Sequence, residues 1–145
     1  MPLDHERLIV YQRSLDFIAW ASVLNKEIGP CGDVRNQLDR ASTSVPLNIA
    51  EGNGKFSIRD RIKYIDIAYG SALECSACLD VVVAKSVATR ERVSHGKQII
   101  EETVNRLVRL RESIAAREAE ERSSNRVREG NSDGWFSLRE MEDNS

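Results

Sequence analysis

Apolar residues recur every three to four positions in four separate segments of the chain, and none of these segments alternates as a β-strand does. The first segment has two adjacent apolar stripes, which predict a helix with a broad buried face. One stripe contains Val10, Phe17, Ala21, Leu24 and Ile28, and the other contains Leu8, Tyr11, Leu15 and Ile18. Gly29-Pro30 should end this helix, and Asp33 is the expected N-cap of the next one.

The second segment predicts a helix that contains a proline. Its apolar face consists of Val34, Leu38, Ala41, Val45 and Ile49. Pro46 removes a backbone donor and crowds the carbonyl of Ser42, so we expect one bent helix, with two short helices as the alternative. The hydroxyls of Ser42, Thr43 and Ser44 should satisfy the freed groups, and Gly52-Asn53-Gly54 should form a left-handed C-cap.

The third segment has the most regular pattern, with steps that alternate between four and three residues. Its stripe contains Ile58, Ile62, Ile65, Tyr69, Ala72, Ser76, Leu79 and Val83. Ser57, followed by Asp60, predicts the N-cap. A parallel row of small residues, Ala68, Ser71, Cys75 and Cys78, should allow a neighbouring helix to approach closely, and Gly70 suggests a close backbone contact.

The fourth segment predicts a helix that starts near Ser94 and fades near Arg122, with Ile100, Val104, Leu107 and Ile114 on its apolar face. Short connections between long amphipathic helices favour antiparallel neighbours. The expected fold is therefore all-α, an antiparallel up-down-up-down four-helix bundle formed by residues 1–116.

The composition changes after Ala116. Residues 117–145 carry eight acidic and five basic side chains, a net charge of −3, and predict a frayed helix end followed by a disordered polar tail. This tail contains a small apolar island, Trp135, Phe136, Leu138 and Met141, which is either an unstructured terminus or a docking element for a partner or for the bundle.

Composition limits the classes of function. The 145 residues suffice for one domain, and 21 basic against 23 acidic residues exclude a strongly basic nucleic-acid binder on bulk charge. No secretory signal and no run of about 18 apolar residues is found, which predicts a cytoplasmic protein without a membrane partner. Cys75 and Cys78 form a C-x-x-C inside a helical apolar pattern, so we interpret them as small buried residues and not as a redox or zinc site.

Three stretches, residues 8–12, 37–52 and 64–74, together resemble a known family. The most specific motifs are Asn48-Ile49-Ala50-Glu51-Gly52 and the Gly-Ser-x-x-Glu of residues 70–74. They resemble the bacterial four-helix-bundle proteins encoded in intervening sequences of large-subunit (23S) rRNA genes, whose superfamily includes the accessory variability determinant of diversity-generating retroelements. The resemblance covers roughly residues 3–116 and implies a homopentameric ring without established catalytic activity.

The same resemblance also implies possible binding partners. In the accessory-determinant branch the ring is basic and binds nucleic acid and a reverse transcriptase. Here residues 1–116 carry 16 basic and 15 acidic side chains, a net charge of only +1. The charge therefore favours self-association more strongly than it favours nucleic-acid binding.

Polar residues close to the apolar stripes predict a structural network that fixes the register of the second and third helices. Its members are Arg40, Asn48, Glu51, Ser71 and Glu74. The alternative is a small enzyme that uses the carboxylates of Glu51 and Glu74 with Arg40. No Glu-x-x-His pair suitable for a di-iron bundle is present, and no cofactor is expected.

Two further groups complete the candidate residues. Lys55 and Arg59 near the start of the third helix, with Arg106 and Arg109 on the fourth, are candidate contacts for nucleic acid or another anion. Interleaved acidic residues on the fourth helix favour a salt-bridged surface instead. Apolar residues outside the predicted stripes, Ile9, Trp20, Ile67 and Val81, are candidates for an interface between protomers.

The sequence thus predicts a non-enzymatic, oligomeric helical scaffold that contacts RNA or a protein partner. The alternatives are the carboxylate enzyme and an adaptor that acts through the C-terminal apolar island.

Overall fold

The computed structural model describes residues 3–128, 139 and 142. In this part of the chain a short 3₁₀ turn, η1 (Asp4–Arg7), precedes four α-helices, and no β-strand is present. The helices are α1 (Ile9–Glu27), α2 (Val34–Asn53), α3 (Ile58–Ala84) and α4 (Arg90–Val127). The predicted all-α class with four helices is confirmed for the described residues.

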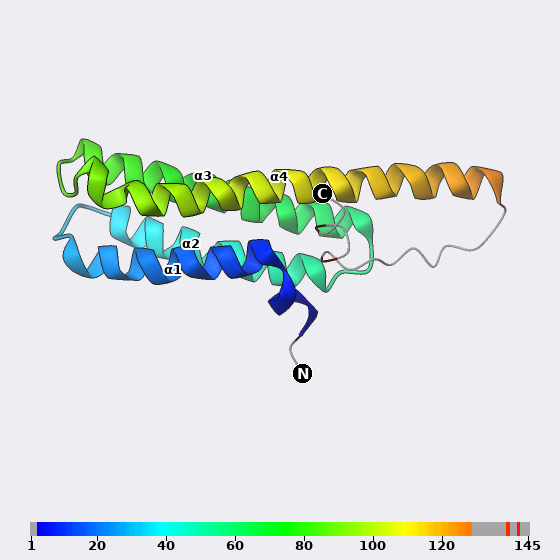
Figure 1. Cartoon of the computed structure of the whole chain (residues 1–145), viewed down its shortest axis with the longest axis horizontal. Helices are drawn as coiled ribbons and strands as arrows, with labels where there is room; N and C mark the ends of the chain where they lie inside the picture. Colours follow the sequence, from blue (N-terminus) through cyan, green and yellow to red (C-terminus); the bar gives the residue numbers. More distant parts are fainter. Residues whose placement is uncertain (1–2, 129–138, 140–141, 143–145) are drawn as a thin grey trace.

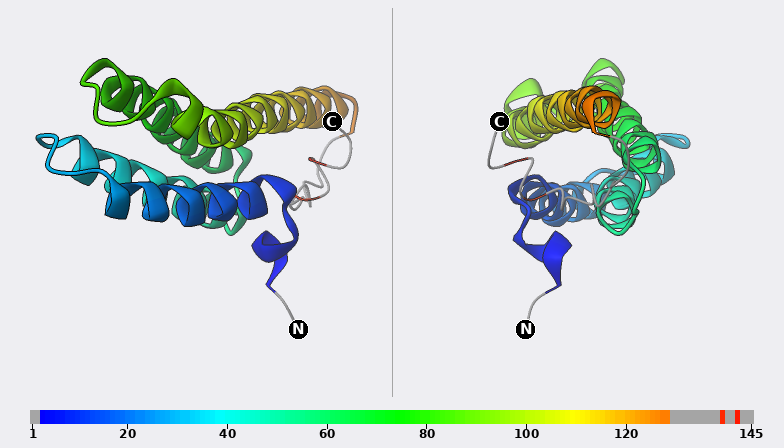
Figure 2. Two further views of the ribbon diagram at one scale, coloured as in Figure 1. Left: turned by 60° about the vertical axis from the view of Figure 1, so that its left-hand side comes forward. Right: turned by 90° about the vertical axis from the view of Figure 1, so that its right-hand side faces the viewer.

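The four helices pack side by side, and the contacts run from α1 to α2, α2 to α3, α3 to α4 and α4 back to α1. The end-on view in Figure 2 shows this arrangement around a common axis. The α1–α2 and α3–α4 connections lie at one end of the molecule and the α2–α3 connection lies at the other (Figure 1). The most extensive contact is between α2 and α3.

The core is apolar and receives side chains from every helix. Phe17, Leu38, Ile65 and Leu107 are at most 1% exposed. Burial of each such side chain contributes roughly 1.5–3 kcal/mol, so this shared core holds the helices together. The first stripes predicted for α1 and α2 are buried at every position.

Helix α2 is continuous through Pro46, but its polar details differ from the prediction. The hydroxyls of Ser42 and Thr43 both donate to the carbonyl of Asp39, at 3.0 and 2.9 Å. They therefore do not replace the hydrogen bond that the carbonyl of Ser42 loses because Pro46 has no N–H. The predicted left-handed C-cap is wrong, because Gly54 has φ −83° and the helix ends without a positive φ. Asp33 makes no capping bond to the backbone and accepts instead from the side chains of Asn36 and Gln37.

Helix α3 begins at the predicted cap, because the Ser57 hydroxyl accepts from the backbone N–H of Asp60 at 3.1 Å. Its buried face is rotated from the predicted stripe toward the row of small residues. Ala68, Cys75 and Cys78 are buried, whereas Ile62 and Tyr69 are only half-buried. Ile65, Ala72 and Leu79 of the predicted stripe are also fully buried, so the core-facing side of α3 combines part of that stripe with the row of small residues, which lets a neighbouring helix approach.

The glycines that permit close approach are not the predicted one. Nothing lies within 4 Å of a Cβ placed on Gly70, which is exposed. A Cβ on Gly52 would lie 3.0 Å from Cβ of Tyr64, and one on Gly96 would lie 2.2 Å from the ring of Trp20. Gly52 and Gly96 therefore bring α2 close to α3 and α1 close to α4.

Helix α4 starts earlier and ends later than predicted. The Thr89 hydroxyl accepts from the N–H of Arg92 at 3.1 Å, so the helix begins four residues before Ser94. It continues past Ala116 to Val127, and Figure 1 shows its end extending beyond the other three helices. Every residue from 122 to 127 is exposed.

Helix α3 is also the one described helix that is long and apolar enough to cross a membrane by composition. One third (33%) of its most apolar window is buried inside the fold, and Ala68, Ala72 and Leu79 are fully buried.

Candidate functional site

A short chain of hydrogen bonds joins α2 to α3. The hydroxyls of Ser44 and Ser71 are 2.8 Å apart, and Nδ2 of Asn48 donates to the Ser44 hydroxyl at 2.9 Å and to the Ser44 carbonyl at 2.8 Å. All three residues are half-buried, where satisfied polar groups fix a particular register at little cost. Asn48 and Ser71 of the predicted network are thus brought together through Ser44, which the sequence did not single out as its link.

The other three predicted members lie elsewhere. The exposed Arg40 is 3.6 Å from the carboxylate of Asp33. Glu51 forms an ion pair with Lys55 at 3.1 Å, one turn further along the chain. Glu74 is exposed. These side chains face solvent, so the structure does not join them to the Asn48–Ser71 contact.

The carboxylates of Glu51 and Glu74 do not share a site. The Cβ position of Gly52 lies beside Tyr64, which places its neighbour Glu51 at that level of α3. Glu74 is ten residues beyond Tyr64, about 15 Å along the helix at 1.5 Å per residue. One small substrate cannot contact both carboxylates over that separation.

The candidate basic residues are partly neutralised. Lys55 pairs with Glu51, which raises the pKa of Lys55 through a side-chain hydrogen bond, and its ammonium lies 5.2 Å from the centre of the Tyr64 ring. Arg59, the second residue of α3, is exposed and lies four residues beyond Lys55 in the chain. The start of α3 thus presents an exposed arginine, and the preceding Lys55 is paired with Glu51.

Basic side chains on the central part of α4 form ion pairs with acidic side chains of α3 and of α4 itself. Arg106 pairs with Glu102 at 3.2 Å, Arg111 with Asp66 at 2.6 Å, and Lys97 with Asp80 at 2.8 Å. Arg109 is exposed. Mixed-charge pairing of this kind weakens a positive field, as the interleaved acidic residues suggested.

The four candidate interface residues fall into two groups. Ile9, Ile67 and Val81 are 43%, 41% and 38% exposed. Trp20 is engaged within its own chain, packed against Gly96 and Phe17, with the Arg92 guanidinium 5.5 Å from its ring. The first three therefore remain available to a second surface, and Trp20 fills the α1–α4 contact.

The cysteines have no features of a reactive site. Cys75 and Cys78 are buried free thiols, and burial raises the pKa of Cys75 and raises that of Cys78 to about 11. A thiol with a raised pKa is a poor nucleophile and metal ligand at neutral pH. No group of three metal-ligating side chains occurs among the described residues.

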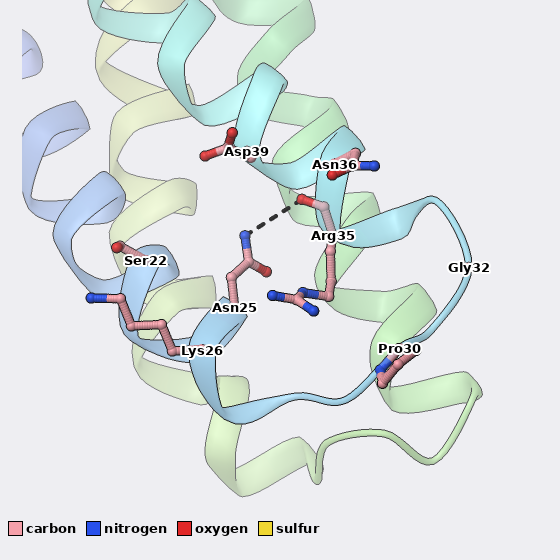
Figure 3. A pocket seen from close by; sticks show the side chains of 8 residues that line it. All are labelled: Ser22, Asn25, Lys26, Pro30, Gly32, Arg35, Asn36 and Asp39. Atoms are coloured by element: carbon pink, nitrogen blue, oxygen red, sulfur yellow. Dashed lines mark hydrogen bonds between the residues drawn. The ribbon is translucent and has the colours of Figure 1, made fainter.

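A polar pocket of 430 Å³ opens where the C-terminal end of α1 meets the start of α2 (Figure 3). Nδ2 of Asn25 donates to the carbonyl of Arg35 at 3.4 Å across this pocket. Lys26 and Arg35 supply positive charge and Asp39 supplies negative charge. The mixed lining does not select one class of ligand.

Sequence reasoning did not identify Glu142, whose carboxylate reaches the start of α1. Its two oxygens accept from the backbone N–H groups of Ile9 and Val10 at 3.1 and 3.0 Å. One signal was present: Leu8, immediately before α1, has no side chain able to cap a helix. The predicted apolar island at Trp135, Phe136, Leu138 and Met141 lies outside the described residues.

Over the residues that the structure describes, the fold and these contacts define a four-helix protein in which several polar side chains link neighbouring helices. Over residues 6–109 the sequence matches the family described as 23S rRNA-intervening sequence protein. The chain belongs to this family, which confirms the predicted resemblance.

A solved structure shares the fold. It is a protein with unknown function from the S23 ribosomal protein family of Bacteroides thetaiotaomicron VPI-5482. The two chains are 25% identical with a TM-score of 0.65, and the match covers 69% of this chain and 95% of that chain. No curated protein matches the sequence.

Proposed function

We propose that the chain is a non-enzymatic scaffold, an antiparallel up-down-up-down four-helix bundle that assembles with copies of itself into a homopentameric ring in the cytoplasm, without a membrane partner. The placement of successive connections at alternating ends supports this topology. The observation that carries self-assembly is the outer stripe of α3, which we define by its exposed apolar and small residues: Ile67, Gly70, Leu73, Ala77, Val81 and Ala84.

This outer stripe extends over about 18 residues at helical spacing and is bordered by the exposed acidic residues Asp66, Glu74 and Asp80. It borders two grooves between α3 and α4, of 690 and 280 Å³, the second lined partly by Leu73 and Val104. The large apolar members of the stripe, Ile67, Leu73 and Val81, are 41%, 44% and 38% exposed, and burial of their exposed parts against another protein surface would be favourable. Its small residues, Gly70, Ala77 and Ala84, would let a partner helix approach closely.

The separation of Glu51 from Glu74 supports a scaffold over the carboxylate enzyme. General acid-base chemistry needs both groups within hydrogen-bond reach of one substrate, and about 15 Å of helix lies between them. The pairing of Glu51 with Lys55 also occupies that carboxylate. The adaptor alternative, which depends on residues 135–141, predicts that deletion after Arg122 abolishes partner capture and leaves self-assembly unchanged.

The test of self-assembly is the molar mass in solution. A chain of 16.3 kDa gives about 82 kDa as a pentamer. We expect light scattering to report the larger mass for the wild type and a much smaller one for Ala77→Glu, which places a charge in the outer stripe. Ala19→Glu on the exposed face of α1 is the matched control and should assemble normally. A monodisperse wild-type monomer at micromolar concentration contradicts the proposal.

RNA contact is a second candidate function, supported by the family description and by Arg59 and Lys55 at the α2–α3 connection. Repetition of this patch around a ring would multiply a modest single-chain affinity. Electrophoretic retardation of single-stranded RNA at low and moderate salt tests this idea. We expect Lys55→Ala/Arg59→Ala to weaken binding and to reduce its salt dependence, whereas Lys26→Ala/Arg35→Ala, with equal charge loss at the opposite end, retains most binding. Absence of retardation at low salt contradicts RNA contact.

A further inference from the structure

Phe56 is an exposed aromatic residue in the connection between α2 and α3. It is 82% exposed, whereas the other five Phe, Tyr and Trp residues that the structure describes are buried or half-buried. Removing the surface of an aromatic ring from water is favourable, so an exposed ring gains free energy by packing against a partner. The ring of Phe56 is therefore a candidate contact surface at the end of the molecule that carries the α2–α3 connection (Figure 1).

The backbone is anchored on both sides of Phe56. The N–H of Lys55 donates to the carbonyl of Gly52 at 3.2 Å, and the carbonyl of Lys55 accepts from Nε of the fully buried Arg61 at 2.8 Å. On the other side, the carbonyl of Ser57 accepts from the N–H of Arg61 at 3.1 Å, and its hydroxyl caps α3. The exposure of Phe56 is thus a property of a hydrogen-bonded connection, so a partner that covers the ring has little backbone to order.

The residues around the exposed ring in the chain are mainly basic. Residues 51–63 carry four basic and two acidic side chains, a net charge of +2, against −2 for the whole chain. The ammonium groups of Lys55 and Lys63 lie 5.2 and 5.7 Å from the centre of the same ring, that of Tyr64, so both reach one part of the surface. Arg59 is exposed one turn before Lys63 on α3. This local charge favours a polyanion as the partner.

The surroundings of Phe56 fit a protein partner less well. The core of a protein–protein interface is mainly apolar and poor in charged residues. Among the described residues 48–66, Phe56 is the one exposed large apolar side chain, and its neighbours in the chain include three lysines and arginines that are exposed or half-buried. An isolated ring among cations is instead the combination that proteins use to bind single-stranded nucleic acid.

We propose that Phe56 is a stacking platform for a base of single-stranded RNA, and that Arg59 and Lys63 contact the phosphates of that strand. Every base has a flat π-face, so such a platform accepts a single strand without reading its sequence. A base inside a duplex is already stacked between its neighbours and cannot cover the ring. The inference rests on the proposed RNA contact and specifies which form of RNA that contact accepts.

The experiment measures the fluorescence anisotropy of a labelled oligouridine strand, and of the duplex that it forms with oligoadenosine, over a series of salt concentrations. The full-length wild type is compared with Phe56→Leu, which keeps apolar surface but has no aromatic face, and with Phe56→Tyr, which keeps that face. Leu47→Ala, at an exposed apolar position of α2, is the matched control. Circular dichroism verifies the helical content of each variant, and light scattering measures its molar mass.

We expect Phe56→Leu to weaken binding of the single strand by about fivefold or more, which is the range for losing one base–aromatic stack. The dependence of this binding on salt should stay unchanged, because no phosphate contact is lost. Phe56→Tyr and Leu47→Ala should bind the strand as the wild type does. The duplex should bind equally to the wild type and to Phe56→Leu.

Equal single-strand affinities of the wild type and Phe56→Leu overturn this inference, and the RNA contact itself then stands if Lys55→Ala/Arg59→Ala still weakens binding. An equal loss of affinity for strand and duplex in Phe56→Leu also overturns it, because stacking cannot act on the duplex. A lower molar mass of Phe56→Leu assigns the ring to a contact between protomers and overturns it as well. If no RNA binds at low salt, the RNA contact and this inference fail together, while light scattering still decides self-assembly.

Discussion

The ring of Trp20 on α1 packs directly over Gly96 on α4. A Cβ on Gly96 would lie 2.2, 2.3 and 2.5 Å from three ring atoms of Trp20. The ring cannot simply move aside, because Phe17 packs at a centroid distance of 5.8 Å on the same helix and Arg92 lies over it. Gly96 is therefore required by packing and not by backbone conformation.

We predict that Gly96→Ala lowers the free energy of unfolding by about 1–3 kcal/mol, because overpacking outweighs the gain of about 1 kcal/mol in helix propensity. Urea denaturation measures this change. In a Trp20→Leu background the obstructing ring is absent, so the same substitution should be neutral or stabilising. Equal destabilisation in both backgrounds would show that the ring contact is not the cause.

Glu102 of α4 is bound by two arginines, Arg13 of α1 and Arg106 of its own helix, so the Arg13 contact links α4 to α1. Burial raises the pKa of this carboxyl, but hydrogen bonds from Arg13 and Arg106 outweigh it and hold the pKa below the usual 4.5. The stabilisation from this lowered pKa is therefore present above about pH 4.5 and is lost as the pH falls through the lower folded-state value.

We predict that Glu102→Gln reduces the loss of stability between neutral pH and about pH 3, as measured by thermal unfolding at a series of pH values. Arg13→Gln should flatten the same profile, because it removes one of the two hydrogen bonds that lower the pKa of Glu102. A profile that stays as steep in both variants would assign acid sensitivity to other carboxylates.

At the residue scale the sequence located contacts that depend on neighbours in the chain. Ser57 caps α3 as expected, because the cap and the bonded N–H are three residues apart. Arg61 was not predicted to be buried, since its Nε reaches the carbonyl of Lys55 only through the particular path of the α2–α3 connection. Arg40 pairs with Asp33, the residue just before its own helix α2, and not with Glu51.

At the element scale, periodicity predicted each helix, whereas the rotation of α3 depended on packing. The bulky stripe with Ile62 and Tyr69 is more apolar, yet the row with Ala68 and Cys75 is more deeply buried. A sequence pattern records hydrophobicity but not the distance between helix axes, which small side chains and Gly52 set here. The late end of α4 was missed because its last turns have no apolar stripe to mark them.

The start of α3 gives a test at this scale. Ser57→Ala removes the acceptor for the N–H of Asp60 and should cost about 1 kcal/mol of stability. Ser57→Asp retains a capping oxygen and adds favourable charge at the helix N-terminus, so it should restore the wild-type value. Thermal unfolding of the two variants distinguishes a capping role from mere exposure of Ser57.

At the scale of the whole molecule, exposed large apolar side chains lie on each of the four described helices, and ion pairs link neighbouring helices. Ile67, Leu73 and Val81 gather on α3, while ion pairs such as Arg92–Glu27 and Arg111–Asp66 tie neighbouring helices together. Sequence reasoning identified Ile67 and Val81 as lying outside the core. It did not identify the Glu142 contact, because no local pattern relates a C-terminal carboxylate to the start of α1.

The length of α4 affects where a protease can cleave the chain. At 1.5 Å per residue its 38 residues span about 57 Å, against about 40 Å for the 27 residues of α3. The last turns consequently open at little free energy, and their amide hydrogens should exchange with solvent long before those beside Leu107. Trypsin can cleave such a segment after Arg122 or Arg126, and one cut there would separate Glu142 from the helices that bind it while the core stays folded.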